Sequence, residues 1–123
     1  TFHGVTSTRL ESIDLALNNA LTYKETASSQ EVLITDRAAG GTAVIEAPVI
    51  GTTDFFAKAV APATGASTIV IGATGGNIVT LNAPQTDITG CSYGDTNGVI
   101  SLSMPYLALP TTAGDNEVSL VFT

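Results

Sequence analysis

The feature that most constrains the fold of this chain is the spacing of apolar runs in its last third. Apolar segments at 77–83, 98–109 and 117–123 are separated by clusters of Gly, Pro, Asn and Asp. Short apolar runs bounded by turn-forming residues are typical of consecutive strands in a β-sandwich or barrel. The sequence therefore predicts a chain built mainly of strands.

The first third carries a longer strand pattern. Apolar side chains occupy most odd positions from 11 to 24, and this period of two predicts one long, half-buried strand, with a bulge or bend at Asn18 and Asn19. The β-branched segments 31–35 and 42–47 then flank a glycine pair, which predicts a hairpin that turns at 36–41.

Further strands are predicted on either side of the glycine-rich segment 72–76. This segment lacks the Lys-Ser/Thr ending of a phosphate-binding loop, and a strand rather than a helix follows it, so a hairpin turn is the favoured interpretation. Pro105 cannot donate to a ladder and is expected on an edge or at a bulge. The strands predicted in this part of the chain, arranged as a meander of hairpins, cover 68–71, 77–82, 86–93, 99–109 and 117–123.

One short helix is predicted at about residues 53–61. A hydroxyl N-cap at Thr52 or Thr53, an acid in the first turn and Pro62 as a stop are the usual helix boundaries. The side chains expected to face the sheet are Phe55 or Phe56, Ala59 and Val60. The predicted fold class is mainly β, an antiparallel β-sandwich or barrel of about seven to eight strands with this flanking helix, in one domain over residues 1–123.

Charge excludes several classes of partner. The net charge is −7, and the four basic residues (Arg9, Lys24, Arg37 and Lys58) are scattered singly, so they cannot neutralise a run of phosphates or an anionic membrane. No apolar run approaches the ~20 residues of a membrane-spanning helix, and no signal peptide is visible. The chain starts at Thr1 rather than Met, which leaves an excised domain, a processed product and a truncated chain as open alternatives.

Residues that carry chemistry are few. Cys91 is the only cysteine and is interpreted as a small buried apolar side chain, and His3, the only histidine, as a solvent-exposed terminal residue. Four acidic residues invite a calcium site, but their spacing fits no calcium loop and turn chemistry explains them; they are Asp87, Asp95, Asp115 and Glu117. No catalytic, cofactor, metal or small-molecule site is predicted, and the protein is not expected to be an enzyme.

Read as one string, residues 30–123 resemble the tail tube proteins of tailed bacteriophages and prophages. The resemblance lies in a hairpin with a glycine-glycine-asparagine start and an alanine-proline end, a strand after an acidic-Gly turn, and an acidic residue before the last strand. The segments that carry it are 75–84, 88–109 and 115–122, together with Asp36-Arg37 and Thr53-Asp54-Phe55-Phe56.

This resemblance implies a virion protein, made in the host cytoplasm, whose copies join into rings that stack into a tube together with other tail proteins. A negatively charged lumen would repel passing DNA. Tubes of this family usually need long loops or terminal arms to link rings, and this chain is short on both, which leaves open a single excised domain, a decoration domain or a baseplate part. Residues 1–10 are the expected docking arm, with Phe2, His3, Val5 and Leu10 as subunit-interface residues. The alternative function is an immunoglobulin-like binding or decoration domain of a virion or adhesin surface protein. Tyr93 and Tyr106 are candidates to place their hydroxyls at an interface.

Overall fold

The computed structural model describes residues 1–6, 8–61 and 63–123, and these residues form nine strands and one helix. All strand pairings are antiparallel, in one seven-stranded sheet and one two-stranded sheet. The predicted mainly-β fold with one short helix is confirmed. The elements are β1 (Leu10–Ile13), β2 (Asn19–Thr26), β3 (Ser29–Arg37), β4 (Gly40–Glu46), α1 (Phe55–Val60), β5 (Gly65–Ile71), β6 (Val79–Ile88), β7 (Ser92–Thr96), β8 (Val99–Leu109) and β9 (Ser119–Phe122).

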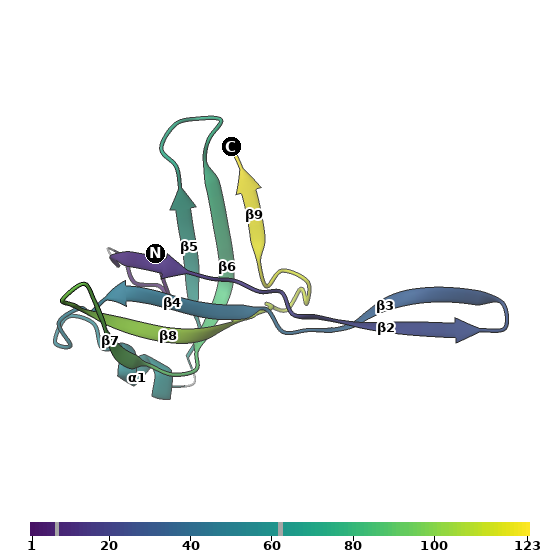
Figure 1. Cartoon of the computed structure of the whole chain (residues 1–123), viewed down its shortest axis with the longest axis horizontal. Helices are drawn as coiled ribbons and strands as arrows, with labels where there is room; N and C mark the ends of the chain where they lie inside the picture. The colour runs from purple at the N-terminus through teal and green to yellow at the C-terminus, as the bar shows by residue number, and fades with distance from the viewer. Residues whose placement is uncertain (7, 62) are drawn as a thin grey trace.

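The seven-stranded sheet folds into two layers that enclose the core. Strands β1, β4, β7 and β8 make one layer, and β5, β6 and β9 make the other, running across the first in Figure 1. The layers are joined where the C-terminal ends of β6 and β8 pair, from Gln85↔Leu109 to Ile88↔Tyr106. The result is sandwich-like, but the strand order β1-β4-β8-β6-β5 is not the simple meander expected from the sequence.

The core lies between the layers and is closed at one end by α1. Its largest fully buried apolar side chains come from the N-terminal segment, the helix and the inner faces of three strands: Phe2, Ile45, Phe55, Ile88 and Met104. The rings of Phe2 and Tyr106 meet edge to face, with centroids 5.7 Å apart. Burying aromatic and aliphatic surface of this kind is the main favourable term in folding.

Residues 10–46 form one long ribbon rather than the strand and hairpin predicted from the sequence. β1 pairs with β4 and β2 pairs with β3, and the register of Ser12↔Val44 continues unchanged through the bridge Ala16↔Gly40 to Asn19↔Arg37. The predicted bend is present, because Asn18 has a left-handed φ of 48°. The chain reverses at Ala27 and Ser28 instead of at 36–41, so the predicted hairpin between 31–35 and 42–47 is wrong.

Gly40 and Gly41, the glycine pair that predicted this hairpin, allow close packing of strands. A Cβ on Gly40 would lie 2.6 Å from the carbonyl oxygen of Tyr106, and one on Gly41 would collide with the carbonyl oxygen of Asp14. These glycines let β4 pass tightly between its neighbours, and they do not turn the chain. The glycine-rich segment 72–76, in contrast, does connect β5 to β6 as the predicted hairpin turn.

The helix is shorter than predicted, and its N-cap lies one residue after Thr53, the later of the two expected caps. Asp54, not a threonine, is the N-cap, and its carboxylate accepts from the Ala57 N–H at 3.0 Å. Phe55 is buried as expected, whereas Val60 is exposed, so the prediction that Val60 faces the sheet is wrong. The predicted stop at Pro62 lies outside the described residues.

Two predictions near the C-terminal half also change. The predicted strand 86–93 is interrupted at Thr89–Cys91, because β6 ends at Ile88 and β7 begins at Ser92. Pro105 lies in β8, a central strand, yet it falls in the gap where β8 exchanges β7 for β6 as its partner. The Pro105 carbonyl accepts from the Thr89 N–H at 3.0 Å. Because neither β6 nor β7 pairs with β8 at Pro105, the lack of an N–H on proline leaves no ladder hydrogen bond unmade on this side.

The substitution Gly41→Ala is expected to destabilise the fold by about 2 kcal/mol or more, because the added methyl forces β4 away from Asp14. Urea unfolding followed by circular dichroism measures this change. Gly75→Ala is the matched control, since a Cβ there meets nothing within 4 Å. Equal stability of the two variants would contradict the role given to Gly41.

Tyr106 of β8 is tied to the segment that follows β1 by its hydroxyl, which donates to the Asp14 carbonyl at 2.8 Å. Burial, with a smaller contribution from the charge of Asp14, raises the pKa of Tyr106 from 10.0 to about 12. The unfolded chain therefore ionises at lower pH than the folded one, and this part of the stability, complete below pH 10, is lost as pH rises toward 12. Tyr106→Phe should lower the free energy of unfolding by about 1 kcal/mol at neutral pH, because the hydrogen bond to Asp14 is lost. Between pH 10 and about pH 12, urea unfolding should show a smaller loss of stability for this variant than for the wild type, because phenylalanine does not ionise.

Candidate interaction surfaces

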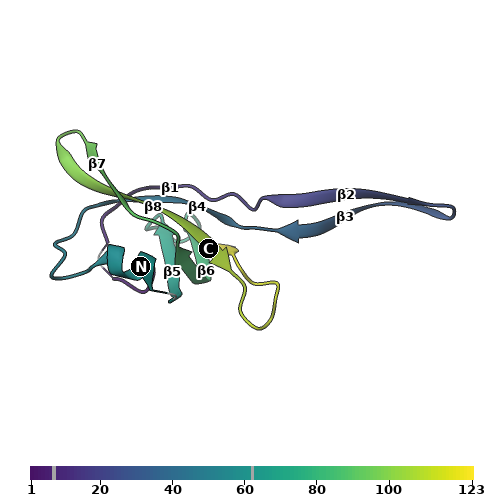
Figure 2. The same ribbon diagram turned by 90° about the horizontal axis from the view of Figure 1, so that it is seen from below.

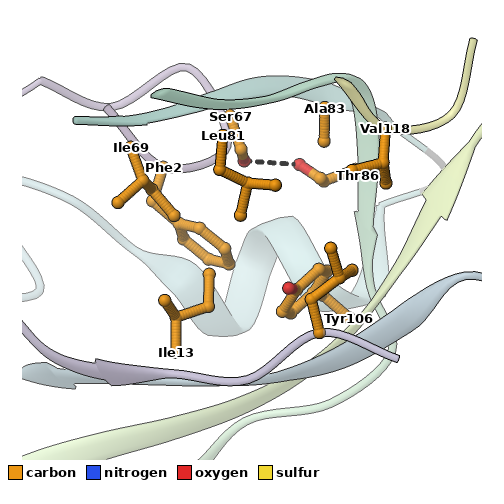
Figure 3. Close-up of a pocket in the computed structure, with 10 residues that line it drawn as sticks. Phe2, Ile13, Ser67, Ile69, Leu81, Ala83, Thr86, Tyr106 and Val118 are labelled. Atoms are coloured by element: carbon orange, nitrogen blue, oxygen red, sulfur yellow. Dashed lines mark hydrogen bonds between the residues drawn. The ribbon is translucent and has the colours of Figure 1, made fainter. Parts of the chain in front are cut away.

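The interior is packed and offers no ligand site. Between the layers the described side chains leave a cavity of only about 10 Å³, roughly the space that one water molecule needs. Figure 3 shows that the side chains around it are almost entirely apolar, and that the two hydroxyls of Ser67 and Thr86 bond to each other at 2.9 Å. Function in this chain must therefore be sought on its surface.

The expected interface residues near the N-terminus lie mostly inside the chain's own fold. Phe2 and His3 are buried, and Val5 and Leu10 are half-buried against the same core. His3 donates its backbone N–H to Ser67 Oγ, its Nε2 lies 3.1 Å from the Ala63 carbonyl, and its buried Nδ1 has no partner among the described residues. The prediction of a solvent-exposed histidine is wrong, because the N-terminal segment hydrogen-bonds along β5 at Ala66 and Thr68.

The remaining candidate side chains have local structural partners. Cys91 is half-buried, donates to the Phe55 carbonyl at 3.3 Å, and has a pKa raised by burial and by the charge of Asp54. Asp95 accepts from the Gly98 N–H in the β7–β8 turn. In the part of the chain that the structure describes, no three His, Cys, Asp or Glu side chains gather as metal ligands. Tyr106 is buried, so only Tyr93 of the two candidate tyrosines is exposed.

The most prominent surface is the hairpin β2–β3, which we call the arm. All residues of both strands are exposed, and Figures 1 and 2 show the arm projecting far from the two layers. The predicted half-buried strand is therefore wrong for this part, and so is the expectation that the chain lacks a long projecting segment. Cross-strand pairing places four apolar side chains on one face, each 58–66% exposed: Leu21 opposite Ile34 and Tyr23 opposite Val32.

The opposite face of the arm is mostly polar. Thr22 lies opposite Leu33 and Lys24 opposite Glu31, and the hydroxyls of Thr22 and Thr35 bond at 3.1 Å. An antiparallel ribbon with one apolar and one polar face normally packs the apolar face against something. Within residues 1–6, 8–61 and 63–123, no segment covers this face.

An ion pair holds the base of the arm. Arg37, at the end of β3, donates from Nε to Glu117 Oε1 at 3.2 Å, and a second nitrogen lies 3.0 Å from Oε2. Glu117 is buried and sits two residues before β9. The two-pronged contact therefore ties the arm to the segment that leads into the other layer.

A second bare apolar surface lies at the far end of the β5–β6–β9 layer, and we call it the sheet end. Its side chains follow Ile69 and Leu81, which line the interior, along the same inner face. Beyond the cover of the other layer this face continues with one half-buried and three exposed apolar residues: Val79, and Ile71, Leu120 and Phe122 with exposures of 57–72%.

A third, shallower surface lies beside the helix. Tyr93 packs on Phe56 with ring centroids 5.1 Å apart, and an open hollow between the β4–α1 loop and the β7–β8 hairpin is lined by Pro48, Val49, Tyr93 and Ile100. Strands β7 and β9 each pair on one side only among the described residues, so both also present a free edge.

No protein-family model, curated protein or solved structure matches this chain. Within the described ranges, no helix has the length and apolar content needed to cross a bilayer.

Sequence reasoning missed the arm, although a signal was present. The apolar stripe at odd positions passes from Ile13 and Leu15, which pack on the core, to Leu21 and Tyr23, which are bare. A strand of 14 residues at ~3.3 Å per residue is longer than a domain of this size can cover. Its length was the available evidence that part of it projects.

The Arg37–Glu117 ion pair is expected to contribute more to the free energy of unfolding than the exposed Arg9–Glu46 pair, which has the same N–O distance of 3.0 Å. Arg37→Met leaves a buried carboxylate without a partner and should cost about 1–3 kcal/mol. Arg9→Met is the matched control: Arg9 and Glu46 are also 3.0 Å apart, but their side chains are 79% and 38% exposed, so the loss should be below about 0.5 kcal/mol. Urea unfolding measures both, and equal losses would contradict the assignment.

Proposed function

We propose that this protein is a structural subunit that works by binding copies of itself, and specifically a tail tube subunit of a tailed bacteriophage or prophage. The observation that carries the proposal is the arm, whose apolar face is uncovered in the single chain. A two-stranded hairpin is marginally stable in water unless its apolar face packs against a further layer. The arm is therefore built for a partner.

Free strand edges supply a second route of association. Pairing of the exposed edges of β7 or β9 with a neighbouring copy would continue the sheet from one subunit to the next. Repeating such a contact by rotation produces a closed ring, and rings that stack produce a tube. In the proposed virion tail, other tail proteins complete the assembly.

The net charge suits a channel for DNA. With −7 on each copy, a lumen lined by many copies would repel the phosphate backbone, and DNA would pass without specific binding. The same charge opposes association of copies, so contacts have to form through uncharged surfaces. The four apolar side chains of the arm and the sheet end meet this requirement, whereas Glu25, near the tip, continues the arm's face with a charge.

The alternative function, an immunoglobulin-like binding or decoration domain, is favoured by one observation. Tyr93 is exposed beside the hollow lined by Pro48, Val49 and Ile100, and an amphipathic aromatic at the rim of an apolar hollow is common in recognition surfaces. Saturable binding to a glycan array that is lost in Tyr93→Ala would support this function over assembly.

Self-association is the decisive test of the proposed function. Purified protein at rising concentration should form rings or stacked tubes in negative-stain electron microscopy and fast-sedimenting species in analytical ultracentrifugation. Because repulsion between copies is screened by salt, raising NaCl from ~50 mM to ~500 mM should increase the assembled fraction. A chain that stays monomeric at millimolar concentration under both conditions would contradict the proposal.

A further inference from the structure

We infer that the apolar face of the arm in one copy covers the sheet end of a neighbouring copy. This inference rests on the proposed self-association and names the two surfaces that meet. Each surface is half of a sandwich: the arm is a ribbon without a sheet beneath it, and the sheet end is a sheet without a ribbon above it.

The first argument is continuity along the ribbon. Within one chain, β1 and β4 cover the inner face of β5 and β6, and Ile13 lies across the core from Ile69 and Leu81 (Figure 3). Leu15 lines the same small cavity. Leu21 and Tyr23 continue the same period-two stripe of the same ribbon beyond the body. The arm thus carries the same kind of apolar face that already packs against this sheet inside the chain.

The second argument is continuity along the sheet. The rows Ile69↔Leu81↔Leu120 and Ile71↔Val79↔Phe122 are successive on one face. In the first row Ile69 and Leu81 line the interior and Leu120 is exposed, and the second row lies beyond the interior. Both bare surfaces are made of aliphatic and aromatic side chains, and the strand residues of the sheet end carry no charge. Their contact therefore avoids the repulsion between two copies of charge −7.

The third argument concerns reach and size. In Figure 1 the arm and the β5–β6 hairpin point in different directions from the body, so an arm held by Arg37 and Glu117 cannot cover its own sheet end. β2 and β3 contribute eight and nine exposed residues, whereas a standard interface uses roughly 20–30 residues a side. Since only one face of the arm, about half of these residues, lies against the neighbour, the arm supplies part of one side of such an interface.

A contact between two different surfaces of identical chains is heterologous, so it leaves a free arm at one end and a free sheet end at the other. This property makes the inference testable by mixing. The arm variant Tyr23→Thr/Ile34→Thr keeps an intact sheet end, and the sheet-end variant Leu120→Thr/Phe122→Thr keeps an intact arm. Both substitute exposed side chains with a good strand former.

Each variant alone is expected to associate at least about tenfold more weakly than the wild type in sedimentation experiments. Mixed in equal amounts, the two variants should form a one-to-one complex that grows no further through this contact, because only one intact pair of arm and sheet end remains. Matched controls alter apolar residues on the opposite faces of the same strands, Leu33→Thr in the arm and Val121→Thr in β9, and should assemble as the wild type does.

Three outcomes would overturn the inference while leaving self-association intact. Normal assembly of the sheet-end variant would show that the arm binds elsewhere, and normal assembly of the arm variant would show that copies join without it. Loss of assembly in both variants with no complex on mixing would exclude this pairing of surfaces. A wild-type chain that never associates would instead contradict the proposed function itself.

Discussion

The structure depends on one constraint, the register of the ribbon formed by residues 10–46, which is constant from Ser12↔Val44 to Ala20↔Asp36. Its inner half closes the core, and its outer half forms the arm. The ribbon can pass from one role to the other because Gly40 and Gly41 allow the backbones of β4, Asp14 and Tyr106 to approach closely. A side chain at either glycine would push β4 away from Tyr106 of β8 or from Asp14. The direction of the arm, which continues from β4, would then change as well.

The body behind the arm is a small sandwich stabilised mainly by apolar burial. Phe2 and Phe55 enter from outside the strands and fill the space that two crossing layers leave between them. Ser67, Thr86 and Tyr106 hydrogen-bond through their hydroxyls inside the body, and burial of these groups without such partners would be costly. Among the described residues, His3 Nδ1 is a buried polar atom without a partner. With the interior filled, the chain's distinctive chemistry lies in what it leaves uncovered.

The sequence was informative where local rules decide the structure. Hairpin β5–β6, the extent of β8 and the position of the helix follow from alternation, turn residues and helix boundaries, and all are present. The pairing of β3 with β2 was not predictable, because Gly40 and Gly41 serve close packing and their local pattern is identical to that of a turn. His3 was misjudged for a related reason, since only the path of the N-terminal segment along β5 explains its burial. Which side chains of the arm and of the sheet end stay exposed depends on how far one layer extends over the other. This is decided by tertiary packing and cannot be read from local sequence patterns.

The ion pair between Arg37 and Glu117 has a geometric consequence for any assembly built by the proposed contact. It fastens the base of the arm to the segment that delivers β9, so the donor surface and the acceptor surface of one subunit are held at a fixed angle. Repetition of that angle from copy to copy sets the curvature of the assembly. One half-buried pair of charges would thereby fix how many subunits close a circle.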